Sequence, residues 1–291
     1  MMRSIADRLL LFGFCAFFLI AAREARVIAQ TAGPVATSHE VYRFVPFYRN
    51  EFDFPQKIVR EKDLITKDSH GVWHRKALPD PDAEWVAEGW GGAEIRDGAL
   101  RVAPWPFDTA GNPKLIAGKE PSHMVVWNRH KLPTNFFLRY DMTPDGSTSG
   151  LTILFFCADG VHGKDLFDLS LPPRRADYVA YHSGQIVNYS DSYWSRNTKT
   201  ESVTNRLRKN PGFTLVAEAP SGTTGPANVT YHVQVLKTGG RIQVTINGKP
   251  NVIWTDSQPL GAGYIGFRSM SGVTLVSYSH LQISEGRLVN N

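Results

Sequence analysis

Short hydrophobic runs separated by turn residues recur along most of the chain. Runs at such close, repeated spacing are typical of a β-sandwich or a β-barrel. No stretch alternates strands with long helices, so the pattern does not favour a parallel α/β sheet. We predict strands at residues 93–103, 122–127, 135–142, 151–158, 177–183, 213–218, 229–237, 241–247, 251–255, 263–269 and 273–283.

One meander can be derived in detail. Residues 230–236 alternate in polarity, and residues 241–246 resume the alternation after the flexible Thr238-Gly239-Gly240 segment. Asn247 and Gly248 follow directly, and this pair suits a type I′ turn because both of its central positions need a positive φ. The pattern therefore predicts two consecutive hairpins.

The first 29 residues have the pattern of an export signal. Arg3 and Arg8 precede an apolar run of 14 residues that ends at Ala22. This run is shorter than the roughly 20 residues that a bilayer span needs, whereas a basic head and a short apolar middle are typical of a secretory signal peptide. We expect cleavage after Ala29, a secreted or periplasmic location and no stable membrane span after cleavage. An uncleaved membrane anchor is the alternative.

The rest of the chain divides into an N-terminal segment and one domain. Residues 30–82 mix aromatic and charged side chains and end in two Pro-Asp pairs, so we expect an extended segment that wraps the body. We find neither an internal repeat nor a linker between Glu88 and Ile283. Residues 83–291 are therefore predicted to form a single β-sandwich domain.

Composition and charge narrow the classes of partner. The chain is 42% hydrophobic, 11% aromatic and 20% charged, which is a globular composition. The net charge of +5 falls to +3 when residues 1–29, with four basic and two acidic side chains, are removed. Dense basic clusters are confined to residues 174–175 and 206–209. Proteins that bind nucleic acid usually concentrate basic charge on one face, so we expect no nucleic-acid partner.

A series of motifs from residue 84 onward resembles a known family. They are Trp85, Glu88-Gly89, residues 122–127 (SHMVVW), 135–137 (NFF), 155–158 (FFCA), 181–184 (YHSG), 192–193 (SY), 205–210 (NRLRKN), 212–213 (GF) and 263–268 (GYIGFR). In this order they resemble the YesU-like family of bacterial proteins, a branch of the concanavalin A-like lectin/glucanase superfamily. The resemblance implies a jelly-roll β-sandwich of two antiparallel sheets whose concave face commonly holds a glycan. It implies no settled reaction, because a fold alone does not specify one.

The densest mixture of polar and aromatic residues is the stretch 177–196 (DYVAYHSGQIVNYSDSYWSR). A sugar ring presents apolar C–H faces to aromatic rings and hydroxyl groups to planar polar groups, so a glycan site needs this mixture. The alternative is that these side chains are core residues, since sandwiches bury many tyrosines with a hydrogen bond at the hydroxyl. The candidate ligand-facing side chains are Tyr181, His182, Tyr189, Tyr193 and Arg196.

A basic segment follows at residues 205–210 (NRLRKN). Arginine binds carboxylates through two parallel hydrogen bonds, so Arg208 with Asn205 and Lys209 could hold a uronate carboxylate. A solvated basic loop is the alternative. His123 and Trp127 lie four residues apart, hence on one face of a strand, and could line the same groove. His123 could equally be a core residue.

Two reactions are open to these side chains. In β-elimination of a uronate-containing polysaccharide, Tyr181 or Tyr193 and His182 would act as base and acid, with Arg208 and Asn205 at the carboxylate. Hydrolysis with retention needs two carboxyl groups roughly 5 Å apart.

Carboxylate patterns give little support to hydrolysis. The Glu-x-Asp-x-Glu pattern that many hydrolases of the superfamily use is absent from the sequence, so hydrolysis would require a pair that meets only in space, such as Glu88 and Asp165.

Metals and cofactors are not expected. The sequence has no phosphate loop, no Gly-x-Ser-x-Gly motif and no paired Cys/His spacing. Residues 159–168 could form a structural calcium site, but calcium takes six to eight oxygen ligands and this loop offers few carboxylates. Cys157 lies within the apolar run 151–158 and is expected to be a small core residue.

Taken together, these features predict a secreted carbohydrate-active protein. We expect it to bind an acidic, uronate-containing polysaccharide in a concave aromatic groove and to cleave it by lyase-type or hydrolytic chemistry. Non-catalytic, lectin-like carbohydrate binding is the alternative, and a structural role in the envelope is a third.

Overall fold

A computed structural model of the protein describes residues 35–37, 40–78, 80, 82–116, 122–145, 151–196, 202–224, 228–270 and 275–289. The predicted signal peptide at residues 1–29 lies outside this part of the chain. Side chains are described from residue 40 onward, and Arg196 is described by its backbone alone. Within these ranges, no helix has both the length and the apolar character that a membrane crossing requires.

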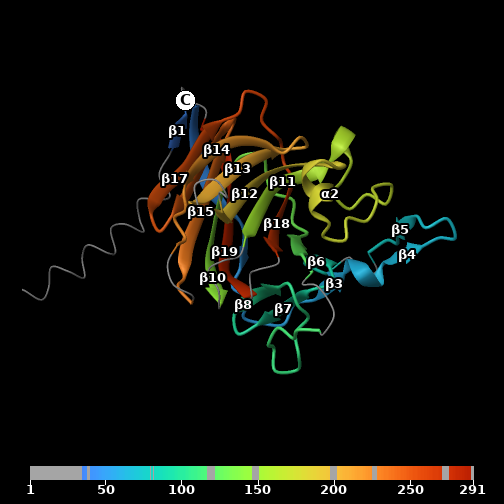
Figure 1. The fold of residues 1–291 in the computed structure, drawn as a ribbon. Coiled ribbons are helices and arrows are strands. Elements are labelled where there is room, and N and C mark those ends of the chain that lie inside the picture. Colours follow the sequence, from blue (N-terminus) through green and yellow to red (C-terminus); the bar gives the residue numbers. More distant parts are fainter. Residues whose placement is uncertain are drawn as a thin grey trace, which may run out of the picture.

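Two β-sheets pack face to face (Figure 1). Sheet A contains, in spatial order, β1 (Val35–Thr37), β2 (Glu40–Asn50), β19 (Leu275–Leu288), β10 (Phe136–Asp145), β15 (Tyr231–Thr238), β16 (Arg241–Ile246) and β17 (Lys249–Thr255), with β8 (Ala99–Ala103) paired to β19 and β7 (Gly92–Arg96) paired to β8. Sheet B contains β14 (Thr214–Pro220), β13 (Val203–Asn210), β12 (Ile186–Arg196), β11 (Thr152–Gly160), β18 (Tyr264–Ser269), β9 (Met124–Asn128), β6 (Trp85–Gly89) and β3 (Ile58–Arg60).

Among the described strands, β3 and β6 form a parallel pair, and all other paired strands are antiparallel. A separate hairpin is formed by β4 (Ile65–Lys67) and β5 (Trp73–Arg75), and α2 (Tyr178–His182) is a short helix beside sheet B. The prediction of an all-β, concanavalin A-like sandwich is confirmed.

The predicted meander is β15-β16-β17. Val233 pairs with Ile246 and Val235 with Val244, and all four side chains are buried in the sandwich. Asn247 and Gly248 have φ values of 50° and 75°, the positive values that a type I′ turn requires. Alternation of apolar and polar residues therefore sets both the strands and the face that each presents.

The main core lies between the two sheets. Leu154, Phe156 and Phe267 of sheet B meet Leu138 and Tyr140 of sheet A, all almost fully buried. Burial of side chains of this size contributes roughly 1.5–3 kcal/mol each. Cys157 lies in the same core, as predicted, and burial raises the pKa of its thiol to about 12.

The N-terminal segment contributes two strands to the sandwich within residues 40–78. β2 pairs with β19 from Tyr42 to Asn50, and β3 pairs with β6. Both sheets therefore include strands from this segment. Backbone hydrogen bonds to a sheet edge give an extended, aromatic-rich segment more stabilisation than loose wrapping would.

The strand predicted at residues 177–183 is wrong. Residues 178–182 form α2, because the Asp177 side chain accepts a hydrogen bond from the backbone N–H of Val179 at 3.1 Å and caps the helix. A five-residue element that alternates in polarity fits either one helical turn or a strand, and the cap decides between them.

A second, smaller apolar cluster lies on the outer face of sheet B. Side chains of β9, β11 and β18 on this face are covered by the segment from η3 (Val161–Gly163) to α2. Figure 1 shows α2 and the β4–β5 hairpin on this side of the molecule. The cluster includes Val125, Trp127, Ile153, Phe155, Leu166, Leu171, Tyr181 and Tyr264.

Candidate functional site

The outer face of sheet B presents two rows of side chains across its strands. Residues paired on neighbouring strands lie side by side on one face. The first row is Arg206, Ser192, Ile153, Arg268, Val125 and Glu88, and the second is Arg208, Ser190, Phe155, Gly266, Trp127 and Val86. Polar and charged side chains on β12, β13, β18 and β6 thus share one face with the apolar cluster.

Cationic and aromatic groups converge beside α2. The Arg208 guanidinium carbon lies 4.3 Å from the centre of the Phe213 ring, and the His182 ring centre lies 4.4 Å from the same ring. The Tyr178 ring is 4.6 Å from His182, and the Arg268 guanidinium carbon is 5.1 Å from Tyr178. We call these five residues the arginine–aromatic patch.

The patch reaches solvent through part of its surface. Phe213 is 37% exposed, while Tyr178, His182 and Arg208 are half-buried and Arg268 is fully buried. Arg208 Nε and Arg268 Nε and Nη1 are buried nitrogens with no hydrogen-bond partner among the residues that the structure describes. The patch therefore has N–H donors left for an acceptor group.

Burial and neighbouring arginines lower the pKa of the two histidines near the patch. Burial, then the charges of Arg268 and Arg208, lowers the pKa of His182. Burial and Arg268 also lower the pKa of His123, to about 4. Both imidazoles are therefore uncharged at neutral pH, and the positive charge of this region comes from its arginines.

A buried group of charges lies on the same face. Glu88 is fully buried and accepts hydrogen bonds from Arg174 Nε at 3.1 Å, Arg75 Nη2 at 3.3 Å and the Tyr181 hydroxyl at 2.5 Å. Arg174 Nη2 also donates to Glu88, and Arg75 Nη2 donates to Glu61. These five side chains form what we call the buried charge cluster.

The two carboxylates of the cluster have opposite pKa shifts. Burial and the neighbouring Glu88 raise the pKa of Glu61. Burial opposes ionisation of Glu88 as well, but Arg174 and Arg75 outweigh it and lower the pKa of this carboxyl. Glu88 is thus held as an ionised anchor that joins β6, β5 and the segment before α2.

The predicted role of Tyr181 as an exposed base does not fit its position. Tyr181 is about 1% exposed, its ring stacks on Phe155 and Trp127, and burial together with Glu88 raises its pKa well above 10. Trp127 is likewise fully buried and does not line a groove. A β-carbon at position 266 would lie 2.4 Å from the Trp127 ring, so Gly266 lets the indole lie flat across β18.

Four further predicted site residues point into the sandwich. Tyr193 and Tyr189 are buried in the core, where their hydroxyls bond the Tyr140 hydroxyl at 3.0 Å and Asp256 at 2.6 Å. Lys209 Nζ lies 2.7 Å from Asp256, and Asn205 is fully buried. These residues occupy alternate positions of β12 and β13 on the core side, shared with Leu207. Tyr189, Tyr193 and Asn205 are too buried to face a ligand, whereas the Lys209 side chain stays 26% exposed beside Asp256.

Glu88 is fully buried and is therefore not accessible as one half of the Glu88–Asp165 pair that hydrolysis would use. Asp165 accepts a hydrogen bond from the Tyr264 hydroxyl at 2.7 Å, whereas Glu88 belongs to the buried charge cluster. Within the described ranges, no group of three or more His, Cys, Asp or Glu side chains could hold a metal ion. The predicted side-chain role of Arg196 falls outside the described residues.

Of the predicted site residues, His182 and Arg208 lie together at the patch, and His123 lies close to Arg268. Other residues of the patch were not predicted from the sequence. Phe213 and Tyr178 complete the surface of the patch, and Arg268 comes from the GYIGFR motif of β18. Alternation along β18 from Tyr264 could have placed Arg268 on this face. No local pattern indicated that Arg75 and Glu61 would meet Glu88.

Comparison with protein-family models matches residues 75–283 to a domain described as a domain of unknown function, DUF1961. The chain belongs to this family. It is 32% identical to the uncharacterized protein YesU of Bacillus subtilis (strain 168) over 202 residues, which are 66% of this chain and 86% of the relative. The family resemblance expected from the motifs is confirmed.

Solved structures support the fold of the family. A Bacillus subtilis protein of unknown function with a galectin-like fold has a TM-score of 0.64 at 27% identity, covering 84% of this chain and 98% of that chain. LamA from Z. galactanivorans, in complex with laminaritriose and laminaritetraose, has a TM-score of 0.50 at 8% identity, covering 83% and 99%. At so low an identity the second likeness shows the fold alone.

Proposed function

We propose that the protein is secreted after cleavage at Ala29 and binds an acidic, uronate-containing polysaccharide at the arginine–aromatic patch. The observation that carries this proposal is the stacking of Arg208 on the partly exposed Phe213, beside His182 and Arg268. Arginine N–H groups suit a carboxylate, and the Phe213 ring suits the C–H face of a sugar. The fold also carries oligosaccharides in LamA, a distant structural neighbour.

Charge at the patch favours an acidic ligand over a neutral one. Carboxylates near Arg208 and Arg268 interact with these arginines electrostatically but form no hydrogen bond with them within the described residues. The buried Glu88 carboxylate is already paired with Arg174 and Arg75. A uronate carboxylate would accept hydrogen bonds from the partly exposed Arg208 guanidinium, whose Nε lacks a partner among the described residues, while the buried Arg268 adds positive charge beneath it. Hydrogen bonds to charged groups contribute about 1.5–3 kcal/mol each.

The same geometry supports β-elimination, with His182 as the proton acceptor. The uncharged imidazole takes the proton from the ring carbon that bears the carboxylate, and the electron pair of that C–H bond forms a double bond to the next ring carbon. The bond from that carbon to the glycosidic oxygen breaks, and the departing oxygen takes a proton from water. Arg208 would neutralise the carboxylate while the proton leaves. Burial of Tyr181 and Tyr193 removes them from this reaction and favours lectin-like binding as the second candidate.

The experiment compares binding and cleavage on polygalacturonate, alginate and a neutral β-glucan. Binding is followed by calorimetry, and cleavage by the absorbance of unsaturated uronates and by reducing ends. Arg208→Ala should weaken binding of the acidic polymers by about ten-fold or more. Arg139→Ala removes an arginine from the outer face of sheet A and serves as the control. If Arg208→Ala, Arg139→Ala and wild type bound the acidic polymers with equal affinity, the patch would be excluded as the binding site. Binding with no cleavage product would leave the lectin-like function.

A further inference from the structure

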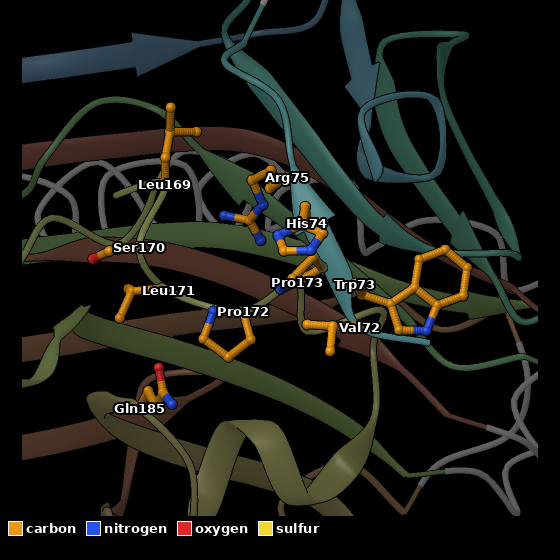
Figure 2. Close-up of a pocket in the computed structure, with 10 residues that line it drawn as sticks. All are labelled: Val72, Trp73, His74, Arg75, Leu169, Ser170, Leu171, Pro172, Pro173 and Gln185. Carbon is orange, nitrogen blue, oxygen red and sulfur yellow. The ribbon is translucent and has the colours of Figure 1, made fainter. Parts of the chain in front are cut away.

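A cavity separate from the arginine–aromatic patch lies between the β4–β5 hairpin and the segment before α2. Its volume is about 290 Å³. It is lined by Val72, Trp73, His74, Arg75, Leu169, Ser170, Leu171, Pro172, Pro173 and Gln185 (Figure 2). Ligand pockets are usually about 300–1,000 Å³, so this cavity is suited to a single small ring.

Arg75 is the buried polar group of the lining. Its side chain is only 4% exposed, and Figure 2 shows it projecting from β5 toward the segment that carries Leu169. Arg75 Nη2 is fixed by Glu61 and Glu88 from the side of the sheet. Carboxylates that hold one edge of a guanidinium also fix the direction of its remaining N–H groups.

The remaining nitrogens of Arg75 need acceptors. Nε and Nη1 are both buried and have no hydrogen-bond partner within the described part of the chain. An N–H donor that is buried without an acceptor costs about 1–3 kcal/mol, and more when charged. A ligand that brings oxygen acceptors into the cavity would remove this cost.

The rest of the lining combines apolar and polar surface. Val72 and Leu169 are 53% and 54% exposed, and the Pro172 ring adds a rigid apolar wall. Ser170 and Gln185 contribute polar side chains to the same lining. Sugar rings match such a surface because they combine C–H faces with hydroxyl groups. Figure 2 shows the Trp73 indole turned away from the other lining side chains.

The charge around Arg75 is already balanced. Arg75 and Arg174 face Glu61 and Glu88 within the buried charge cluster, which offsets two positive groups with two negative ones. At the edge of the cavity, His74 bonds Asp68 at 2.8 Å. A carboxylate ligand would therefore meet Glu61 and Glu88 behind the guanidinium, whereas an uncharged ligand would not be repelled.

We propose that this cavity binds one uncharged sugar ring, with Arg75 donating hydrogen bonds to its hydroxyl or ring oxygens. This site is additional to the arginine–aromatic patch and shares no lining residue with it.

The test follows the Arg75 side-chain Nε–H resonance by NMR during titration with the methyl glycosides of glucose, galactose and mannose. Methyl glucuronoside is the acidic comparison. We expect a saturable shift of the Arg75 resonance with at least one neutral glycoside, and a smaller or absent shift with the glucuronoside. The resonance is assigned with Arg75→Lys, and the backbone amide spectrum of that variant reports whether the fold is kept.

A second variant keeps the proposal testable if Arg75→Lys does not fold. Leu169→Trp places a bulky ring over the cavity and should weaken binding of the neutral glycoside by about ten-fold or more. Ile253→Trp is a matched control, because Ile253 is similarly exposed at 48% and lies on β17 of sheet A. It should leave the affinity within about two-fold.

Several results would overturn the inference. They are the absence of any shift with the neutral glycosides, a shift with the glucuronoside alone, and equal affinity of Leu169→Trp and wild type. Arg208→Ala separates this inference from the proposed function. It should leave binding of the neutral glycoside unchanged while it weakens binding of acidic polymers, so either site can fail without the other.

Discussion

The hydroxyl of Tyr181 donates a hydrogen bond of 2.5 Å to Glu88, and both side chains are buried. This bond joins α2 to β6, two elements that are 93 residues apart in the sequence. Arg174 and Arg75 hold the same carboxylate from other directions. The segment that covers sheet B is therefore anchored by one ionised side chain.

Tyr181→Phe should destabilise the protein without removing a catalytic group. Loss of a hydrogen bond to a buried charge lowers the free energy of unfolding by about 1.5–3 kcal/mol. Urea denaturation measures this change, with Tyr42→Phe as the control, since the Tyr42 hydroxyl bonds Glu40 near the surface. Acidic-glycan binding by the folded variant should equal that of wild type. If Tyr181→Phe kept full stability but lost binding or cleavage, Tyr181 would instead be part of the functional site.

The Trp127–Gly266 contact gives a prediction about packing. Gly266→Ala places a methyl group against the Trp127 ring and should lower the free energy of unfolding by about 1–3 kcal/mol. Gly261→Ala is the matched control, because a β-carbon there meets nothing within 4 Å. Thermal unfolding of the two variants makes the comparison. Equal stabilities would show that the outer cluster can accommodate the methyl group.

Asp191 should make stability depend on pH. It is fully buried, and burial raises the pKa of its carboxyl to about 7. The folded protein therefore holds this proton more tightly than the unfolded chain, whose aspartates have a pKa of about 3.9. The stabilisation is complete below about pH 4 and is lost as the pH rises toward 7.

Asp191→Asn should remove this part of the pH dependence. Its free energy of unfolding should change less between pH 5 and pH 8 than that of wild type, by on the order of 1–4 kcal/mol. Asp145→Asn changes an exposed carboxylate at the end of β10 in sheet A and controls for a general charge effect. Identical pH profiles for wild type and Asp191→Asn would contradict the prediction.

Elimination by His182 would have a characteristic pH dependence. Burial and the nearby arginines lower the pKa of His182, so the imidazole stays uncharged down to a pH below its ordinary value of 6.5. Cleavage of an acidic polymer should therefore fall only below that pH, as His182 takes up a proton. His182→Gln should abolish cleavage and retain most of the binding. Undiminished cleavage by His182→Gln would assign the base to another group.

Salt concentration should affect binding at the two proposed ligand sites differently. Raising the ionic strength from about 0.1 M to 1 M shortens the Debye length from about 10 Å to about 3 Å. Binding of polygalacturonate at the arginine–aromatic patch should weaken markedly over this range, whereas binding of a neutral methyl glycoside should not. Calorimetric titrations at both ionic strengths test this difference. Salt-independent binding of the acidic polymer would argue against the role of Arg208.

Alternation along the chain was sufficient to predict an all-β fold, and the resemblance of the motifs to a known family selected the sandwich over a barrel. Apolar residues fall at every second position, Val233 and Val235 in β15 and Ile242, Val244 and Ile246 in β16, which fixes both strand and buried face for these two strands. The Asn247–Gly248 turn was predictable because few residue pairs tolerate two positive φ values. Residues 177–183 were not predictable in this way, since one capping hydrogen bond, which the Asp177 side chain accepts from the Val179 N–H, favours a helix over a strand for an alternating stretch.

The sequence by itself determined the β-sandwich, the family motifs and the gathering of aromatic and basic residues at 177–196 and 205–210. Only the tertiary structure decided that His182 and Arg208 reach a common surface while Tyr193 and Asn205 enter the core. The physical reason is that neighbouring residues of a strand face opposite sides, so a shift of one position exchanges core for surface. Glu88 likewise finds Arg75 and Arg174 only when separate segments meet, because no local pattern encodes the partner of a buried charge.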